Sequence, residues 1–236
     1  MPKKVAAAES AGFSGFADDG AKFFKGLAKN QSRDWFMAHK AEFEAGWNGP
    51  MKLALAEVRD KIDAAYPHAD LDEPRVFRIF RDVRFSKDKS PYKTHVGGTI
   101  SVKRTGKLTE VPVALYFHVG LPQSFAAAGH YMMDGPALAR YRAAVADDAR
   151  GKELVKILAS LTKKGFSPDT REGYKRVPRG FDEDHPRAEL LKRKGLIVSF
   201  PPLPKGMLTS PKVIGWLAGH CKTTAPLVEW LVFATA

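Results

Sequence analysis

The residues best suited to bind an anion gather in one short segment, residues 75–95. It contains seven Lys or Arg residues, one His and only two acids, Asp82 and Asp88. Arginine forks match the geometry of phosphate and carboxylate groups, and lysines supply point charges. Bulky apolar residues are interleaved with the arginines, so we expect a rigid element that aims its cations at an anion. The predicted ligand-binding cations of this segment are Arg78, Arg81, Arg84, Lys87, Lys89 and Lys93.

A second basic segment in the C-terminal third is a candidate to complete the site. Its Pro and Gly residues are typical of a shaped loop, and loops on a rigid scaffold often carry function. We expect Arg176 and Arg179 to join the first segment. Asp182, Asp184 and His185 form the best general acid/base cluster of the chain. They also fit a simple helix N-terminus, where acids face the positive end of the helix dipole, and we favour that interpretation.

Two histidines are predicted to contribute polar groups near the cations. His95 ends the first basic segment, and His118 lies within an apolar run that is typical of a strand. No pair of histidines has a metal-binding spacing, so no metal site is predicted. A Walker loop, a dinucleotide-binding glycine fingerprint and a nucleophile elbow are absent from the sequence, which therefore leaves the cofactor unknown.

The net charge of +12 is unevenly distributed along the chain. Residues 75–110 carry ten basic and three acidic side chains, a net charge of +7, and residues 151–236 carry fifteen and eight, again +7. Residues 1–74 carry ten and twelve, a net charge of −2. This asymmetry indicates a directed basic surface, for which a small anionic molecule or a nucleic acid is the candidate partner.

Composition predicts an ordinary globular protein of the cytoplasm. The chain has 236 residues and one cysteine, Cys221, so it cannot form an intramolecular disulfide and fits a reducing compartment. The N-terminus lacks the apolar stretch of a signal peptide, and no apolar run approaches the roughly 20 residues that span a bilayer. We expect a flexible N-terminus over residues 1–11, one domain over residues 12–236 and no membrane association.

The first third of the chain is predicted to be helical. Asp18 or Asp19 can cap a first helix and Ser32 a second, and Asn48-Gly-Pro50 predicts the start of a third. The middle third reads as extended, with strands over 96–103 and 112–119 joined by a turn at 105–106.

The basic run over residues 75–85 fits two structures. As a strand it places Arg78 and Arg84 on one face and Arg75 and Arg81 on the other. As a helix it would gather Val76 and other apolar residues into one stripe. We favour the strand, because β-branched and aromatic residues dominate the apolar positions. Arg78 and Arg84 are then the pair expected to reach the ligand.

The remaining sequence predicts a mixture of helices, loops and one short strand. Residues 124–129 and 165–187 read as loops, and 197–200 as a strand. Helices are expected over 136–149, 152–161 and 211–221, briefly before residue 193, and again from Pro226. The order predicts an α+β fold with a helical N-terminal third, a central, mostly antiparallel sheet and C-terminal helices packed on that sheet.

The basic motif resembles the hallmark of domain-of-unknown-function family 2461, which occurs in bacteria and fungi. The resemblance covers nearly all of residues 12–200 and implies one α+β domain, with no activity to carry over. At residues 126–128 this chain has three alanines where relatives tend to be richer in glycine. The stretches that carry the resemblance are Arg78–His95, Gly15-Phe16, Asn30–Phe36, Tyr116–His118, Ser124–Gly129, Pro178–Asp182 and Asp184–Pro186.

Three functions remain open from the sequence. The leading one is binding of a phosphorylated or otherwise anionic ligand, with nucleic acid as one candidate. The second is a phosphate-directed hydrolase or transferase that uses His95, His118, Asp182 or His185 for proton transfer. The third is a scaffold whose basic face docks an acidic protein.

Overall fold

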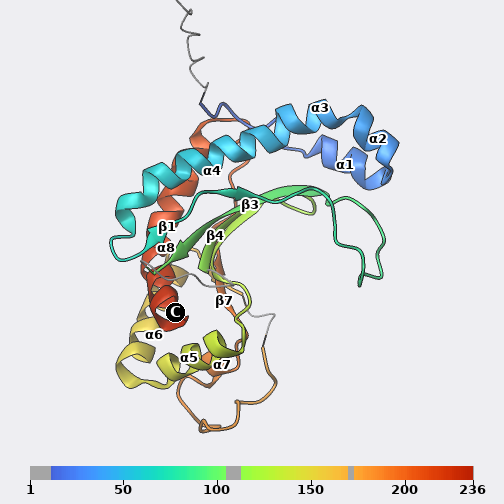
Figure 1. The fold of residues 1–236 in the computed structure, drawn as a ribbon. Helices are drawn as coiled ribbons and strands as arrows, with labels where there is room; N and C mark the ends of the chain where they lie inside the picture. The colour runs from blue at the N-terminus through green and yellow to red at the C-terminus, as the bar shows by residue number, and fades with distance from the viewer. Residues whose placement is uncertain (1–11, 105–112, 170–172, 236) are drawn as a thin grey trace, which may run out of the picture.

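The computed structural model describes residues 12–104, 113–169 and 173–235. The expected flexible N-terminus and the predicted turn at 105–106 therefore lie outside the described residues. The architecture is α+β, with N-terminal helices, a central antiparallel sheet and C-terminal helices (Figure 1). No helix among the described residues is long and apolar enough to cross a membrane.

The sheet has the strand order β1-β3-β4-β5-β7-β6, and β2 pairs with the same strand, β3, as β1 does. All of the pairings are antiparallel. Figure 1 shows that the long strands curve, so the sheet has a convex and a concave face. The strands are β1 (Asp70–Leu71), β2 (Arg75–Val76), β3 (His95–Lys103), β4 (Val113–Gly120), β5 (Phe125–His130), β6 (Ser167–Pro168) and β7 (Leu196–Ser199).

Strand β5 corrects one prediction, since residues 124–129 were expected to form a loop. The segment pairs with β4 and β7, and Ala126 and Ala128 are buried. Alanine and glycine are depleted in strands, and serine and glycine are typical turn residues, which is why the sequence of this segment indicates a loop. Strand pairing on both sides and burial under a helix determine its structure instead.

The N-terminal helices form one layer on the sheet. They are α1 (Lys22–Lys29), α2 (Arg33–Ala38), α3 (Lys40–Phe43), a π-helical turn η1 (Glu44–Asn48), α4 (Gly49–Ile62) and a 3-10 turn η2 (Asp63–Ala65). Ser32 caps α2 as predicted, its hydroxyl accepting from the amide of Trp35 at 3.3 Å.

The helix predicted to start at Asn48-Gly-Pro50 is α4, which begins at Gly49 and follows α3 through the π turn η1 without a break. The amide of Gly49 donates to the carbonyl of Glu44, five residues earlier, and so forms a π turn. Pro50 has no amide hydrogen to continue an α-helical ladder, and the wider turn lets the chain pass this position without a break.

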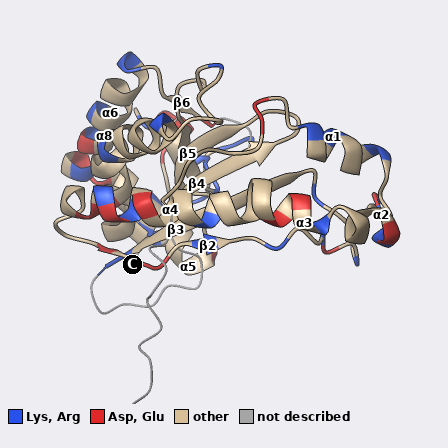
Figure 2. Ribbon diagram, turned by 90° about the horizontal axis from the view of Figure 1, so that it is seen from above, with Lys and Arg blue, Asp and Glu red and all other residues tan. Residues whose placement is uncertain are grey.

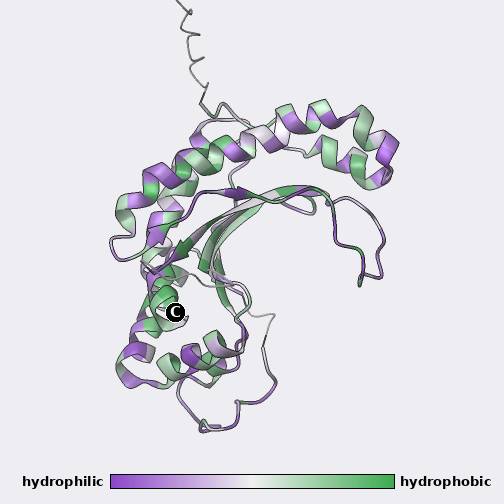
Figure 3. Ribbon diagram, in the orientation of Figure 1, coloured by the Kyte–Doolittle hydropathy of each residue, from purple (hydrophilic) through white to green (hydrophobic). Residues whose placement is uncertain are grey.

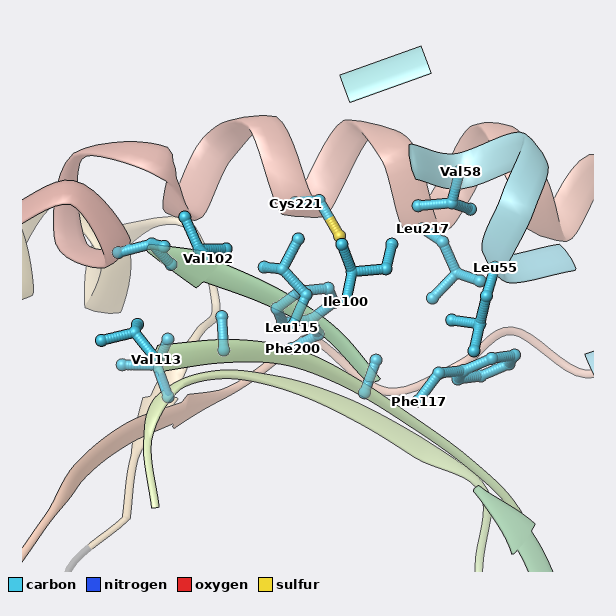
Figure 4. Packing of buried hydrophobic residues seen from close by; sticks show 14 of the residues in the cluster. Leu55, Val58, Ile100, Val102, Val113, Leu115, Phe117, Phe200, Leu217 and Cys221 are labelled. Carbon is cyan, nitrogen blue, oxygen red and sulfur yellow. The ribbon is translucent and has the colours of Figure 1, made fainter. Parts of the chain in front are cut away.

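The hydrophobic core lies between the convex face of the sheet and helices α4 and α8. Figure 4 shows Val113, Leu115 and Phe117 of β4 on the side of the sheet that faces these helices, together with Leu55 of α4 and Leu217 of α8. The stripe of α4 that faces the sheet is hydrophobic, whereas its outer side is largely polar (Figure 3). Cys221 of α8 is a buried, free thiol within this core, and burial raises its pKa to about 12.

The C-terminal helices are α5 (Gly135–Ala146), α6 (Asp148–Lys163), α7 (Ala188–Leu191) and α8 (Lys212–Thr235). Two helices were predicted where α8 is continuous through Pro226, so that prediction was wrong. Proline leaves the carbonyl four residues earlier without its helical donor. Both Pro226 and Lys222 lie on the exposed side of α8, where this carbonyl is open to water and the cost is small.

Arg187 joins α5 to the loop before α7 and was not singled out from the sequence. It is only 8% exposed, and its guanidinium donates to the carbonyls of Val145 at 2.7 Å and Ala146 at 3.1 Å. These are among the last carbonyls of α5, which have no helical partner of their own. A Cβ at Gly151 would approach Nε of Arg187 to 2.4 Å, so a glycine is needed there.

We expect replacement of Arg187 by Met to lower the free energy of unfolding by about 3 kcal/mol, because buried carbonyls lose charged donors. Urea denaturation followed by circular dichroism measures this change. Replacement of the exposed Lys156 by Met is the matched control and should change the value by less than about 0.5 kcal/mol. A loss below about 1 kcal/mol for R187M would contradict the proposed bracing role.

The buried side chain of His130 makes the free energy of unfolding depend on pH. It is buried at the end of β5, and neither ring nitrogen has a hydrogen-bond partner among the described residues. Burial lowers its pKa to about 4, whereas an unfolded histidine titrates near about 6.5. Between these values the unfolded chain binds the proton and the folded chain does not, so stability falls as the pH falls from about 6.5 to about 4.

Replacement of His130 by Leu should therefore flatten the pH dependence of stability in that window. We expect H130L to exceed the native chain in stability at pH 5 by about 1–2 kcal/mol, measured by urea denaturation at several pH values. The exposed His68, replaced by Gln, is the control and should leave the curve unchanged. Parallel curves for H130L and the native chain would show that another group sets the dependence.

Candidate anion-binding site

The basic run forms a long, irregular hairpin, residues 77–94, that leaves the sheet edge between β2 and β3 (Figure 1). Its two arms are joined by bonds from Lys93 N to Ile79 O at 2.8 Å and from Arg81 N to Pro91 O at 2.9 Å. The strand predicted over 75–85 is correct only for Arg75–Val76. Antiparallel backbone bonds continue only as far as Arg81, so no strand carries Arg84 onto the same face as Arg78, and the predicted pairing of these two arginines has no basis in the backbone.

Two arginines of the hairpin pair with its own two acids. Arg81 forms an ion pair with Asp88, and Arg84 forms a forked pair with Asp82, with Nε–Oδ1 at 3.0 Å and Nη2–Oδ2 at 2.7 Å. Hydrogen bonds from Ser90 and the ion pair with Arg81 hold the pKa of Asp88 well below its usual range. The hairpin is therefore braced internally, and two of its predicted ligand-binding cations are already neutralised.

The other cations of the hairpin have no carboxylate partner among the described residues. The ammonium of Lys89 donates to Val83 O at 3.0 Å and that of Lys93 to Arg78 O at 2.9 Å. These bonds orient the lysines without neutralising them. Arg78 and Lys87 are exposed. Arg78, Lys87, Lys89 and Lys93 therefore carry the uncompensated positive charge.

One cleft brings part of this charge together with His95. Its volume is about 380 Å³, and it lies between the end of α1 and the returning arm of the hairpin. Burial, followed by repulsion from Arg78, lowers the pKa of Lys93, as expected where positive charge is poorly solvated and uncompensated. The cleft is lined by Ala28, Gln31, Arg81, Asp88, Ser90, Tyr92, Lys93, Thr94 and His95.

His95 is the free end of a short polar chain on the concave face of the sheet. Its ring stacks on that of His118 with 4.0 Å between centroids. Nε2 of His118 lies 3.3 Å from Leu121 O, which can only accept, so this nitrogen carries the hydrogen. Nδ1 of His118 then accepts from the hydroxyl of Tyr116 at 3.0 Å. Both nitrogens of His118 are thus occupied, whereas the ring of His95 has no hydrogen bond to the described residues.

The pKa values on this face are shifted toward the neutral forms. Burial lowers the pKa of His118, and burial together with His118 and Lys93 lowers that of His95 to about 4. Burial raises the pKa of Tyr116 to about 12. Gly97 makes the arrangement possible, because a Cβ there would lie 2.8 Å from the hydroxyl oxygen of Tyr116. At neutral pH His95 is therefore an uncharged imidazole beside an ammonium.

The second basic segment does not reach the cleft. Figure 1 shows the hairpin near α1 and α2, and the loop before α7 at the opposite end of the sheet. Arg176 and Arg179 are exposed there, and neither lines the cleft. Asp182 accepts from the amide of Asp184 and His185 Nδ1 from that of Arg187, so they shape the turn before α7. Figure 2 shows both signs of charge along α3 and α4, so the helical layer is not uniformly basic.

Gln31 is a cleft residue that sequence reasoning missed. Its side-chain oxygen accepts from the amide of Tyr92 at 3.0 Å, which ties the hairpin to the end of α1. Phe36 stacks on Tyr92 at 4.6 Å between centroids and adds an apolar tie. Sixty-one positions separate Gln31 from Tyr92, and no local signal in the sequence predicts so distant a contact.

Comparison with protein-family models matches residues 19–230 to a family described as "Conserved hypothetical protein (DUF2461)". The matched range includes the hairpin, the cleft and the polar chain of the concave face. The comparisons with curated proteins and with solved structures gave no match. Since the family model spans most of the chain, the protein belongs to the DUF2461 family of conserved hypothetical proteins.

Proposed function

We propose that this protein binds a small phosphorylated or otherwise anionic ligand in the cleft beside the hairpin. The observation that supports it best is that Lys93 lines the cleft and that its ammonium has no carboxylate partner among the described residues. Thr94 and Ser90 add hydroxyl groups to the same cleft, and the neutral ring of His95 can donate or accept. A cleft of about 380 Å³ is in the size range of small-molecule sites. We also propose a cytoplasmic location, because Cys221 is an unpaired thiol.

Nucleic acid is the larger alternative ligand, and one observation favours it. Phe85 is 95% exposed near the turn of the hairpin, with the guanidinium of Arg84 5.8 Å from its ring centroid. Exposed aromatic rings beside cations stack on bases in single-stranded nucleic acid. Such a ligand would contact Phe85 and Lys87 outside the cleft, whereas a small anion would need only the cleft.

Replacement of Lys93 by Met should weaken binding of a small anion by about tenfold or more, because the uncompensated charge in the cleft is lost. Isothermal titration with inorganic pyrophosphate and with adenosine monophosphate measures this change. Replacement of Lys156 on α6 by Met is the matched control and should leave affinity unchanged. Equal affinities for K93M and the native chain would remove the cleft as the site.

A twelve-nucleotide oligothymidylate tests the alternative ligand by its salt dependence. If nucleic acid is the ligand, log affinity falls steeply with log salt, and F85A weakens binding by about tenfold, since one stacked base contributes roughly 1–3 kcal/mol. If log affinity does not change with log salt and F85A binds the oligothymidylate as the native chain does, nucleic acid is excluded as the ligand and the small anion is retained.

A second proposed function is phosphate-directed hydrolysis or transfer, which the neutral state of His95 favours. A base must be unprotonated at working pH, and the ring nitrogens of His95 make no hydrogen bond to the described residues, whereas both nitrogens of His118 do. The stacked His118 would then position His95 and take no proton itself. Asp182 and His185 bond locally in the turn before α7 and do not line this cleft.

Turnover of the phosphorylated compounds that bind, assayed with and without Mg²⁺, tests this function. We expect H95N to lower the rate by about a hundredfold or more while binding stays within about threefold, because general-base catalysis contributes roughly 10²–10⁴. Binding without product under all conditions, or equal rates for H95N and the native chain, would leave only the binding function.

A further inference from the structure

A second groove lies on the opposite side of the hairpin base from the anion cleft. Its volume is about 410 Å³, and residues 76–80 form one wall while α2, α3, η1 and α4 form the other. None of its lining residues lines the anion cleft. The groove is lined by Phe36, Met37, Lys40, Phe43, Glu44, Asn48, Lys52 and Val76–Phe80.

The strand wall of this groove is an unpaired sheet edge. In β2, the pair Arg75↔Thr99 and the bond from Phe77 N to Gly97 O direct odd-numbered backbone groups toward β3. The alternation of an antiparallel ladder then turns the amide and carbonyl of Val76 outward. Farther along, the bonds of Ile79 and Arg81 to the returning arm flank Phe80. The amide and carbonyl of Phe80 therefore also point outward. Within the described parts of the chain, no strand pairs with this outer edge.

The side chains of the groove are apolar within and basic at the rim. Phe36 and Phe43 are buried, whereas Phe80 is 51% exposed and Met37 54% exposed. Monomeric proteins usually cover or blunt an edge that combines free backbone groups with exposed apolar side chains.

The charges of the groove select the partner. Lys40, Lys52 and Arg78 lie at its rim and have no carboxylate partner among the described residues. The single acid, Glu44, already accepts a hydrogen bond from Asn48 at 2.6 Å. A partner of negative charge is therefore favoured, and a second copy of the same basic edge is disfavoured.

We infer that this groove binds an extended acidic segment of another protein, which adds as a strand to the edge at Val76–Phe80. Its backbone would pair with the free groups of Val76 and Phe80. One apolar side chain in two would enter the groove between Phe80 and Met37, and the alternate acidic side chains would face Lys40, Lys52 and Arg78. Strand addition gives affinity through the main chain and specificity through alternate side chains.

The probe for this inference is a fluorescein-labelled dodecapeptide in which Glu alternates with Val and Phe. Fluorescence anisotropy with the full chain should give binding that K52E weakens by about tenfold or more, because one rim charge is reversed. The matched control K156E, on α6, should bind as the native chain does. K52E should still bind pyrophosphate as the native chain does, because Lys52 does not line the anion cleft, so failure of the anion site and failure of the groove are distinguishable.

Hydrogen exchange separates strand addition from simple charge attraction. The amides of Val76 and Phe80 should exchange at about one tenth of their free rate or more slowly when the peptide is bound, since each gains a hydrogen-bond partner. Two further peptides, with proline at either of two adjacent central positions, cover both registers, and at least one should lose binding because proline removes a ladder donor.

Three results would overturn the inference. They are no binding of the alternating acidic peptide at about 1 mM, binding without slower exchange at Val76 and Phe80, and undiminished binding of both proline peptides. Sedimentation that shows a dimer with protection at these amides would assign the edge to a second copy of the chain, and would also overturn the acidic partner.

Discussion

Strict alternation of side chains along β3 and β4 is the constraint on which the rest of the structure depends. Apolar side chains of β3 are buried against α4 and α8, and those of β4 against α8, and this burial stabilises the sheet. The same alternation turns Tyr116 and His118 to the concave face. A shift of register by one residue would exchange the two faces, so the core and the polar chain of the candidate site are specified together.

The hairpin shows how a strongly basic segment can be stable before any ligand binds. Its two acids are used locally, Asp82 for Arg84 and Asp88 for Arg81. Exposed ion pairs contribute little to folding stability, so their main effect is on geometry. They brace the hairpin and leave a smaller set of cations, chiefly Lys93 in the cleft and Lys87 outside it, to attract an anion.

Two sides of the hairpin base offer different chemistry. The returning arm, with Lys93 and His95, forms a compact polar cleft with the end of α1. The outgoing arm presents a free strand edge to an aromatic groove beneath α2–α4. Tyr92 and Phe80 form the bridge between the arms, and both contact Phe36. A ligand on one side therefore acts on residues that are packed against the other side.

The sequence by itself determined the α+β class, the two long strands, most of the helices and the family. Periodicity and capping are local signals, which is why Ser32 and the faces of β4 could be predicted. It also led to the prediction of Lys93, His95 and His118 as site residues, because a dense basic motif and an alternating strand can be seen without the fold.

Only the tertiary structure decided which of these residues lie together. Continuity of α8 through Pro226 and the strand at Ala126–Ala128 come from burial, which overrides weak or unfavourable local preferences. Arg81 and Arg84 were expected to bind a ligand, but Arg81 reaches Asp88 when the hairpin folds back, and Arg84 pairs locally with Asp82 in the folded hairpin. Arg176 and Arg179 match the first segment in charge, yet sheet topology places them at its far end. Charge and periodicity are properties of the chain, whereas proximity is a property of the fold.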